Sequence, residues 1–181
     1  MLRQFAALIL ICCGTVTHAE EPKVDQKDAG RDLRNVFLTT KPEKFGVQPS
    51  NDYPRVCAIA MDWPIDEHFA TVVSVCDGSA SVYTTGTFGI IGGIGHETVR
   101  TAAKKLVKEA DRYYDDSTPT QDFSYPSRGH VRFYLVTFGG VRVIETDLGA
   151  VTKQRGKYST LFDLAQDVIG QLWIVIDEHE K

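Results

Sequence analysis

Apolar and polar residues form three adjacent strand-like segments in the first half of the chain. Residues 55–63 are rich in apolar side chains and alternate weakly, while residues 69–76 (FATVVSVC) are β-branched, as is typical of strands. Asp77-Gly78 then leads into a third such segment over 79–85. An Asp-Gly pair between apolar segments is a strong hairpin signal, because a type I′ turn needs positive φ at both central residues. The pattern therefore predicts a three-stranded meander.

Further along the chain, the apolar residues repeat with a period of 3.6 residues. Over 96–114, apolar residues recur at helical spacing on one side and Arg and Lys lie on the other, which predicts an amphipathic helix. Residues 130–146 alternate again around Gly139-Gly140, which predicts a second hairpin. A last helix is predicted to begin at Thr160, although its terminal apolar run LWIVI (172–176) also fits a strand.

The predicted order of elements is βββ-α-ββ-α. These elements form an α+β fold in which helices pack on an antiparallel sheet of about five strands. We expect a single α+β domain over 37–178, preceded by a flexible polar leader over 20–36. A short helix around 31–38 could follow the piece EEPKVDQKDAG (20–30), overlapping the end of this leader, and would place Leu33, Val36 and Phe37 on one face.

The N-terminus has the pattern of an export signal. A positive charge precedes an unbroken apolar run over 5–13, and the small residue Ala19 precedes the expected cleavage point. A membrane-spanning helix needs about 20 apolar residues, so this run is too short to be one. We expect a signal peptide over 1–19, a location in the periplasm or outside the cell, and no integral membrane segment after cleavage. The alternative is a lipid anchor on Cys12 or Cys13.

Two cysteines lie outside the expected signal, Cys57 and Cys76. If the first turn of the meander centres on Asp66-Glu67, antiparallel pairing places the two cysteines directly opposite each other. Their Cα atoms would then be about 4.5 to 5.5 Å apart, within the range that a disulfide needs. The alternatives are a bridge, which an oxidising compartment would favour, and two small apolar core residues.

The composition is that of an ordinary folded protein with a slight acidic excess. Of 181 residues, 43% are hydrophobic and 24% are charged, and the formal net charge is −4. This balance argues against a nucleic acid as the partner, because phosphate binding needs clustered Lys and Arg. We therefore expect no nucleic-acid partner.

Five glycines fall within Gly86–Gly95, directly before the helix predicted over 96–114. Backbone N–H groups at such a position can hold an anion or an oxyanion. The candidate ligand-binding residues are Gly92, Gly93, Gly95 and His96. Alternatively, the glycines allow the helix and the sheet to approach closely, with the interleaved isoleucines burying the segment. Glu97 in the first helical turn would repel an anion, so we favour the structural joint.

Common catalytic signatures are absent from the sequence. It contains no GxSxG elbow, no Walker loop and no dinucleotide-binding glycine pattern. His96-Glu97 begins like a zinc-protease helix, but Arg100 stands where the second histidine would be. We therefore assign no catalytic residue, no metal site and no cofactor.

Two smaller groups of residues could also carry a function. The run Asp66-Glu67-His68 could form a metal or acid–base cluster, but in a polar turn it is expected to be solvated surface. Phe123 and Tyr125 could contact a partner, or could form a lid that packs on the sheet.

One stretch resembles a segment of uncharacterised bacterial proteins. In the string DGSASVYTTGTFGIIGGIGHETVRTAAKKLV (77–107), a DG turn, a Ser-x-Tyr strand, a glycine-rich Ile-Gly loop and a His-headed helix follow one another. The flanking segments MDWP (61–64), HVRFYLVT (130–137) and LFDLAQDVI (161–169) are similar as well. The resemblance implies a shared fold and brings no activity. At fold level, the element order is similar to profilin, longin and roadblock-type domains, which implies a binding or dimerisation module.

The leading hypothesis is an exported, non-catalytic α+β protein that binds a partner protein or forms a homodimer. One alternative is a small ligand-binding enzyme or hydrolase that uses the Gly86–Gly95 loop and His96 as an anion site. Another is an inhibitor or immunity-type protein that neutralises an exported toxin.

Overall fold

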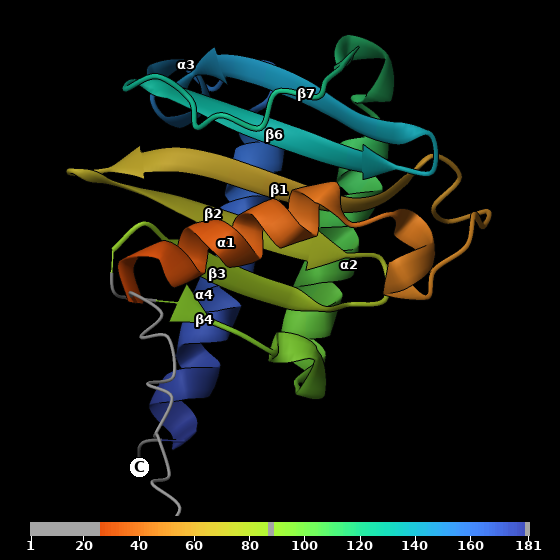
Figure 1. Cartoon of the computed structure of the whole chain (residues 1–181), viewed down its shortest axis with the longest axis horizontal. Coiled ribbons are helices and arrows are strands. Elements are labelled where there is room, and N and C mark those ends of the chain that lie inside the picture. The colour runs from red at the N-terminus through yellow and green to blue at the C-terminus, as the bar shows by residue number, and fades with distance from the viewer. Residues whose placement is uncertain (1–25, 87–88, 180–181) are drawn as a thin grey trace, which may run out of the picture.

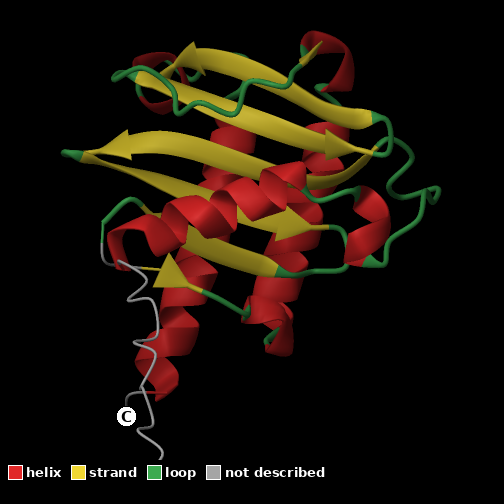
Figure 2. Cartoon of the chain, viewed as in Figure 1, coloured by secondary structure: helices red, strands yellow, loops and turns green. Residues whose placement is uncertain are grey.

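Helices and an antiparallel sheet form three layers, with α1 on one face of the sheet and α2 and α4 on the other (Figures 1 and 2). The computed structural model describes residues 26–86 and 89–179, and the expected signal peptide and lipid-anchor cysteines lie outside them. The helices are α1 (Gln26–Thr39), α2 (Glu97–Asp111), α3 (Leu148–Thr152) and α4 (Ser159–His179). The strands are β1 (Val56–Ile65), β2 (His68–Val75), β3 (Ala80–Thr84), β4 (Gly89–Ile90), β5 (Thr118–Pro119), β6 (His130–Thr137) and β7 (Gly140–Asp147).

The sheet grows outward in both directions from β1. Its strand order is β4-β3-β2-β1-β6-β7-β5, and every neighbouring pair is antiparallel. The predicted α+β class and antiparallel sheet are therefore confirmed. The predicted count of about five strands and the order βββ-α-ββ-α are wrong, since seven strands form in the described residues. The two additional strands, β4 and β5, have two residues each, which is too short to show a period in the sequence.

The predicted meander is present, but one of its turns differs. Ile65 pairs with His68, so the first turn is centred on Asp66-Glu67 as expected. The connection from β2 to β3 has three residues between the paired Val75 and Ser79. Only Gly78 among them has positive φ, at 102°, so the expected type I′ turn does not form.

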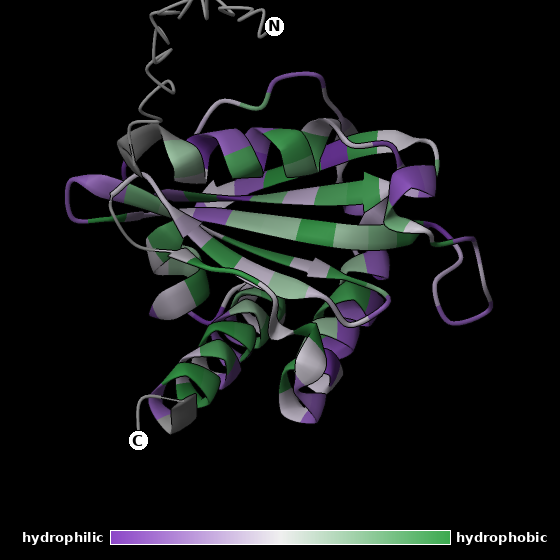
Figure 3. Ribbon diagram, turned by 60° about the horizontal axis from the view of Figure 1, so that its bottom comes forward, coloured by the Kyte–Doolittle hydropathy of each residue, from purple (hydrophilic) through white to green (hydrophobic). Residues whose placement is uncertain are grey.

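The strand β1 is buried on both faces. Seven successive residues from Val56 are buried because α1 covers one face of the sheet while α2 and α4 cover the other (Figure 3). A strand with two buried faces needs apolar residues at nearly every position, which explains why residues 55–63 alternate only weakly.

Helix α1 begins at Gln26, so the leader expected over 20–36 is helical from that residue onward. The helix lies directly on the sheet at Gly30, where a Cβ atom would be 2.1 Å from the carbonyl oxygen of Thr84. Its buried residues are Arg34, Phe37 and Leu38, while Leu33 and Val36 are exposed. The predicted face of Leu33, Val36 and Phe37 is therefore wrong, because the sheet receives Arg34 instead.

Helix α4 includes the run 172–176, so the strand alternative for this run is wrong. The first part of the helix packs through Leu161, Ala165 and Val168. Its last turns extend beyond β4, past the edge of the sheet (Figure 1). Across the described segments of the chain, none of the helices combines the length and the apolar character needed to cross a membrane.

Candidate binding surface

An apolar groove lies where the end of α4 meets the glycine segment. It has a volume of about 380 Å³. Its lining residues are Ile90, Ile91, Gly92, Gly93, His96, Leu172, Val175 and Ile176. This set, which we call the apolar groove, is formed by two parts of the chain that are distant in sequence. Five of its eight members are aliphatic, so the groove favours an apolar occupant.

The end of α4 is apolar around its whole circumference. Five consecutive apolar residues, Leu172 to Ile176, occupy more than one helical turn. Leu172 is buried, whereas Trp173 and Ile174 are 48% and 52% exposed. A helix that is apolar all round is normally buried on all sides. This end of α4 therefore has more apolar surface than its own chain covers.

The glycine segment adds further exposed apolar side chains to the same region. Ile91 is 68% exposed and Ile94 is 46% exposed, and only Ile90 is buried. The expectation that isoleucines bury this segment is therefore wrong for two of the three. At Gly93 the glycine segment packs tightly against two helices, because a Cβ atom there would lie 2.5 Å from Leu172 Cδ2 of α4 and 2.6 Å from Val99 Cγ1 of α2.

The four candidate ligand residues are only partly brought together. Gly92, Gly93 and His96 line the apolar groove, and Gly95 does not. The backbone N–H of His96 donates to the Gly93 carbonyl at 3.2 Å, so this amide is already used within the loop. Neither Lys nor Arg is among the described residues that line the groove. The anion site remains a prediction, and its surroundings are those of an apolar site.

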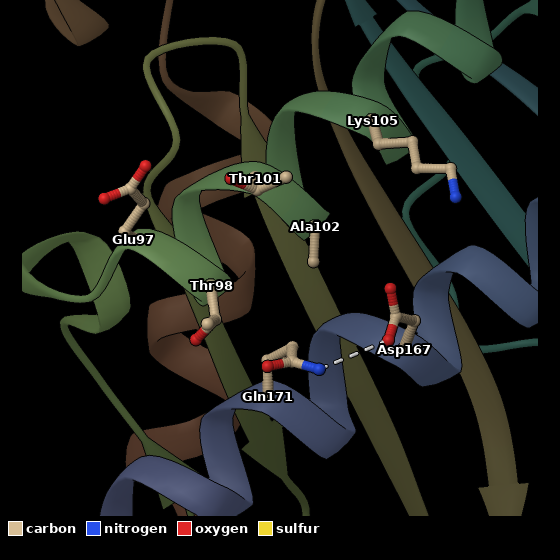
Figure 4. Close-up of a pocket in the computed structure, with 7 residues that line it drawn as sticks. All are labelled: Glu97, Thr98, Thr101, Ala102, Lys105, Asp167 and Gln171. Carbon is tan, nitrogen blue, oxygen red and sulfur yellow. Dashed lines mark hydrogen bonds between the residues drawn. The ribbon is translucent and has the colours of Figure 1, made fainter.

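A second, more polar groove runs between α2 and α4 (Figure 4). Its volume is about 550 Å³, and its lining residues are Glu97, Thr98, Thr101, Ala102, Lys105, Asp167 and Gln171. Gln171 Nε2 donates to Asp167 Oδ1 at 3.5 Å within α4. The side chains of this groove carry hydroxyl groups, an amide and charges of both signs. Such groups suit hydrogen bonds with a partner that lies along the groove. We call this set the polar groove.

The two cysteines lie opposite each other in the predicted register. The backbone N–H of Cys76 donates to the Cys57 carbonyl at 2.8 Å, continuing the pairing of β1 with β2. Both are buried free thiols in the structure, which has no bridge between them. Of the two alternatives left open by the sequence, the structure therefore has the two small core residues and not the disulfide. Burial, with a smaller effect of the nearby Cys76, raises the pKa of the Cys57 thiol to about 12.

A buried ion pair joins α1 to the sheet, and the sequence analysis did not find it. Arg34 Nε donates to Asp62 Oδ2 at 2.9 Å, and the two side chains are 1% and 0% exposed. Thr71 donates its hydroxyl to the other carboxylate oxygen at 2.5 Å. Arg34 Nη1 also donates to the carbonyl of Phe123 at 2.8 Å. The pair thus connects α1, β1, β2 and the loop before β6. Burial raises the pKa of Asp62, although Arg34 and Thr71 act in the opposite direction.

The remaining candidate residues have structural surroundings. The ring of Tyr125 stacks on Phe69 with centroids 4.8 Å apart, and Phe123 contacts Tyr134 edge-on at 6.1 Å. These loop aromatics therefore form the lid on the sheet rather than an exposed surface. Residues 66–68 are exposed at the β1–β2 turn, and Glu67 pairs with Arg128 at 2.9 Å. Within residues 26–86 and 89–179, no three His, Cys, Asp or Glu side chains are grouped so that they could hold a metal ion.

Comparison of the chain with protein-family models, with curated proteins and with solved structures finds no match.

Proposed function

We propose that this protein is a non-catalytic binding module whose docking surface is the apolar groove together with the exposed apolar residues beside it. A partner protein or a second copy of the chain would cover the end of α4. We call the apolar groove and the exposed apolar residues beside it the docking surface. The exposed residues beside the groove are Ile94, Trp173 and Ile174.

The single observation that carries this proposal is the apolar circumference of α4 beyond the edge of the sheet. Scattered single apolar residues are common on protein surfaces, but a contiguous apolar patch is rarer and marks interaction sites. Here Trp173 and Ile174 belong to one helical turn and lie next to a groove of aliphatic side chains. Trp is also one of the residue types enriched among side chains that dominate interface energetics.

We also propose that the protein acts outside the cytoplasm. The apolar run over 5–13 and the small residue Ala19 support cleavage after that residue. Intact-mass measurement on protein isolated from each cell fraction tests this directly. The expected result is a chain beginning at residue 20 in the exported fraction, and a chain that retains residues 1–19 in the cytoplasm would contradict it.

The binding role is tested by comparing assembly in two matched double variants. Ile91→Ser/Ile174→Ser removes two exposed side chains of the docking surface without changing the charge. Leu33→Ser/Val36→Ser removes two exposed apolar side chains of α1, on the opposite face of the sheet. Both sites are exposed, so both variants are expected to fold.

Light scattering coupled to size exclusion, on protein isolated gently from its own cells, gives the mass of each assembly. We expect the wild-type chain and the α1 variant to elute in a complex and the Ile91/Ile174 variant to elute as a single chain. If the wild-type protein elutes as a single chain with no partner, and both variants elute in the same way, the proposal is contradicted.

A further inference from the structure

We infer that the docking surface takes a cationic amphipathic segment of another protein. Its apolar side chains would fill the apolar groove and its Lys or Arg side chains would meet the acidic residues around the groove. This inference rests on the proposed binding role and adds the chemistry of the partner.

The charge of α4 itself favours a cationic partner. This helix contains four acidic residues and no Lys or Arg; they are Asp163, Asp167, Asp177 and Glu178. Asp163 is neutralised by Arg155, whose Nη1 lies 2.7 Å from its carboxylate. Asp177 directly follows the apolar run, and Asp167 lines the polar groove on the neighbouring face of the helix. Acidic side chains therefore border the docking surface along α4.

An acidic side chain also lies on the other side of the groove, where the glycine segment meets α2. Glu97 follows the groove residue His96 directly and is exposed. Arg100, the cation near this point, keeps its positive charge but directs its Nη1 to the Ile94 carbonyl, at 2.8 Å, rather than to the Glu97 carboxylate. Lys105 also lines the polar groove, but it lies about 12 Å further along α2 than Glu97.

The direction of α4 favours a cationic partner as well. The helix ends at His179, and its last carbonyl groups carry partial negative charge at the same end of the molecule as the docking surface. Cations are stabilised near a helix C-terminus, so the backbone adds to the effect of Asp177. The carboxylates and the backbone therefore favour the same kind of partner.

These charges also weigh against the other occupants. If two copies of the chain met through α4, Asp167 and Asp177 of each copy would approach those of the other, and like charges across an interface are destabilising. An anionic membrane surface would be repelled for the same reason, since such membranes attract Lys and Arg. A cationic protein segment combines apolar contact with opposite charge.

Three labelled 18-residue peptides test the inference. They share one stripe of leucines at helical spacing and differ only in the flanking residues, which are Lys, Gln or Glu. Fluorescence anisotropy during titration with the full chain gives the affinity of each peptide. We expect the Lys peptide to bind at least tenfold more tightly than the Glu peptide, with the Gln peptide between them. The preference should shrink at high salt, because salt screens exposed charges.

Protein variants separate the apolar and the charged contributions. Ile91→Ser/Ile174→Ser should weaken the Lys peptide at least tenfold, and the control Leu33→Ser/Val36→Ser should leave its affinity unchanged. Asp167→Asn/Asp177→Asn should bring the Lys and Glu peptides close to equal affinity while apolar binding persists. Circular dichroism and thermal unfolding of each variant show whether it is folded.

The outcomes distinguish this inference from the proposed function. Equal binding of all three peptides, abolished by the Ile91/Ile174 substitutions, would overturn the cationic preference and leave the binding role intact. Absence of peptide binding, with a dimer that the same substitutions dissociate, would assign the surface to a second copy and overturn the inference. A shift of tryptophan emission on neutral phosphatidylcholine vesicles, without peptide binding, would assign it to a lipid surface. Absence of all these signals would overturn both proposals.

Discussion

Removing one partner of the buried Arg34–Asp62 pair should destabilise the protein far more than removing both. The guanidinium donates to both carboxylate oxygens, at 3.1 and 2.9 Å from Nε, and again from Nη2. It also donates to the Phe123 carbonyl, and the Tyr125 ring lies 4.2 Å from its Cζ. The Asp62→Ala substitution alone would leave the charge of Arg34 without a carboxylate to pair with. Arg34 is only 1% exposed, so this unpaired charge would be buried.

The expected magnitude follows from this burial. Leaving one charge of a buried pair unpaired destabilises a protein by about 3–5 kcal/mol, whereas replacing both partners by apolar residues of similar volume is often nearly neutral. Typical domains are stable by only about 5–15 kcal/mol, so Asp62→Ala should remove a large share of the total. The double replacement Arg34→Met/Asp62→Leu should be much closer to wild type than either single variant.

Equilibrium unfolding in urea gives the free energy of unfolding for Asp62→Ala, for the single variants Arg34→Met and Asp62→Leu, and for the double variant that combines these two. Asp52→Ala serves as the control, because it removes an exposed pair in which Lys108 lies 2.8 Å from Asp52, and we expect no measurable change there. Two results would refute the reasoning: a loss below about 1 kcal/mol for Asp62→Ala, or single effects that simply add up in the double variant.

Two further predictions concern the joint at the glycine segment and the buried thiols. Gly93→Ala should lower the free energy of unfolding by about 1–3 kcal/mol, since its Cβ would meet Leu172 and Val99. Gly95→Ala has open space and serves as the control in the same urea titration; equal losses in both would contradict this packing. In reducing buffer, the raised pKa of Cys57, about 12 against an ordinary 9.0, contributes stability that is present below pH 9 and lost as the pH rises toward 12. Wild type should therefore lose stability more steeply than Cys57→Ala between pH 9 and 11, by up to about 1.4 kcal/mol per pH unit, and parallel curves would be the contrary result.

Local patterns predicted most of the regular elements. The meander, the second hairpin and the helices α2 and α4 each have a period, a turn or a cap that is visible over a few residues. The edge strands β4 and β5 depend on pairing with distant partners, so two residues alone carried no signal. The short helix α3 was missed for a similar reason, because five residues give little more than one turn.

The features missed at the sequence level depend on contacts between distant segments. Asp62 lies in the middle of an apolar strand, which is an unusual place for a carboxylate, and this was an available signal for a buried partner. Nothing in the sequence identified Arg34 as that partner, because 28 residues separate the two. The apolar run 172–176 was recognised, but its exposure depends on where the sheet ends, which only the assembled fold determines.

Photo-crosslinking from single positions tests most directly whether the end of α4 is covered by another protein. A photoreactive amino acid replaces Ile174, Ile91 or, as the control, Val36, each of which is exposed. Illumination of cells that produce the full-length chain is followed by mass analysis of the adducts. We expect protein adducts from positions 174 and 91 and none from position 36. Equal labelling from all three positions, or labelling from position 36 alone, would contradict it.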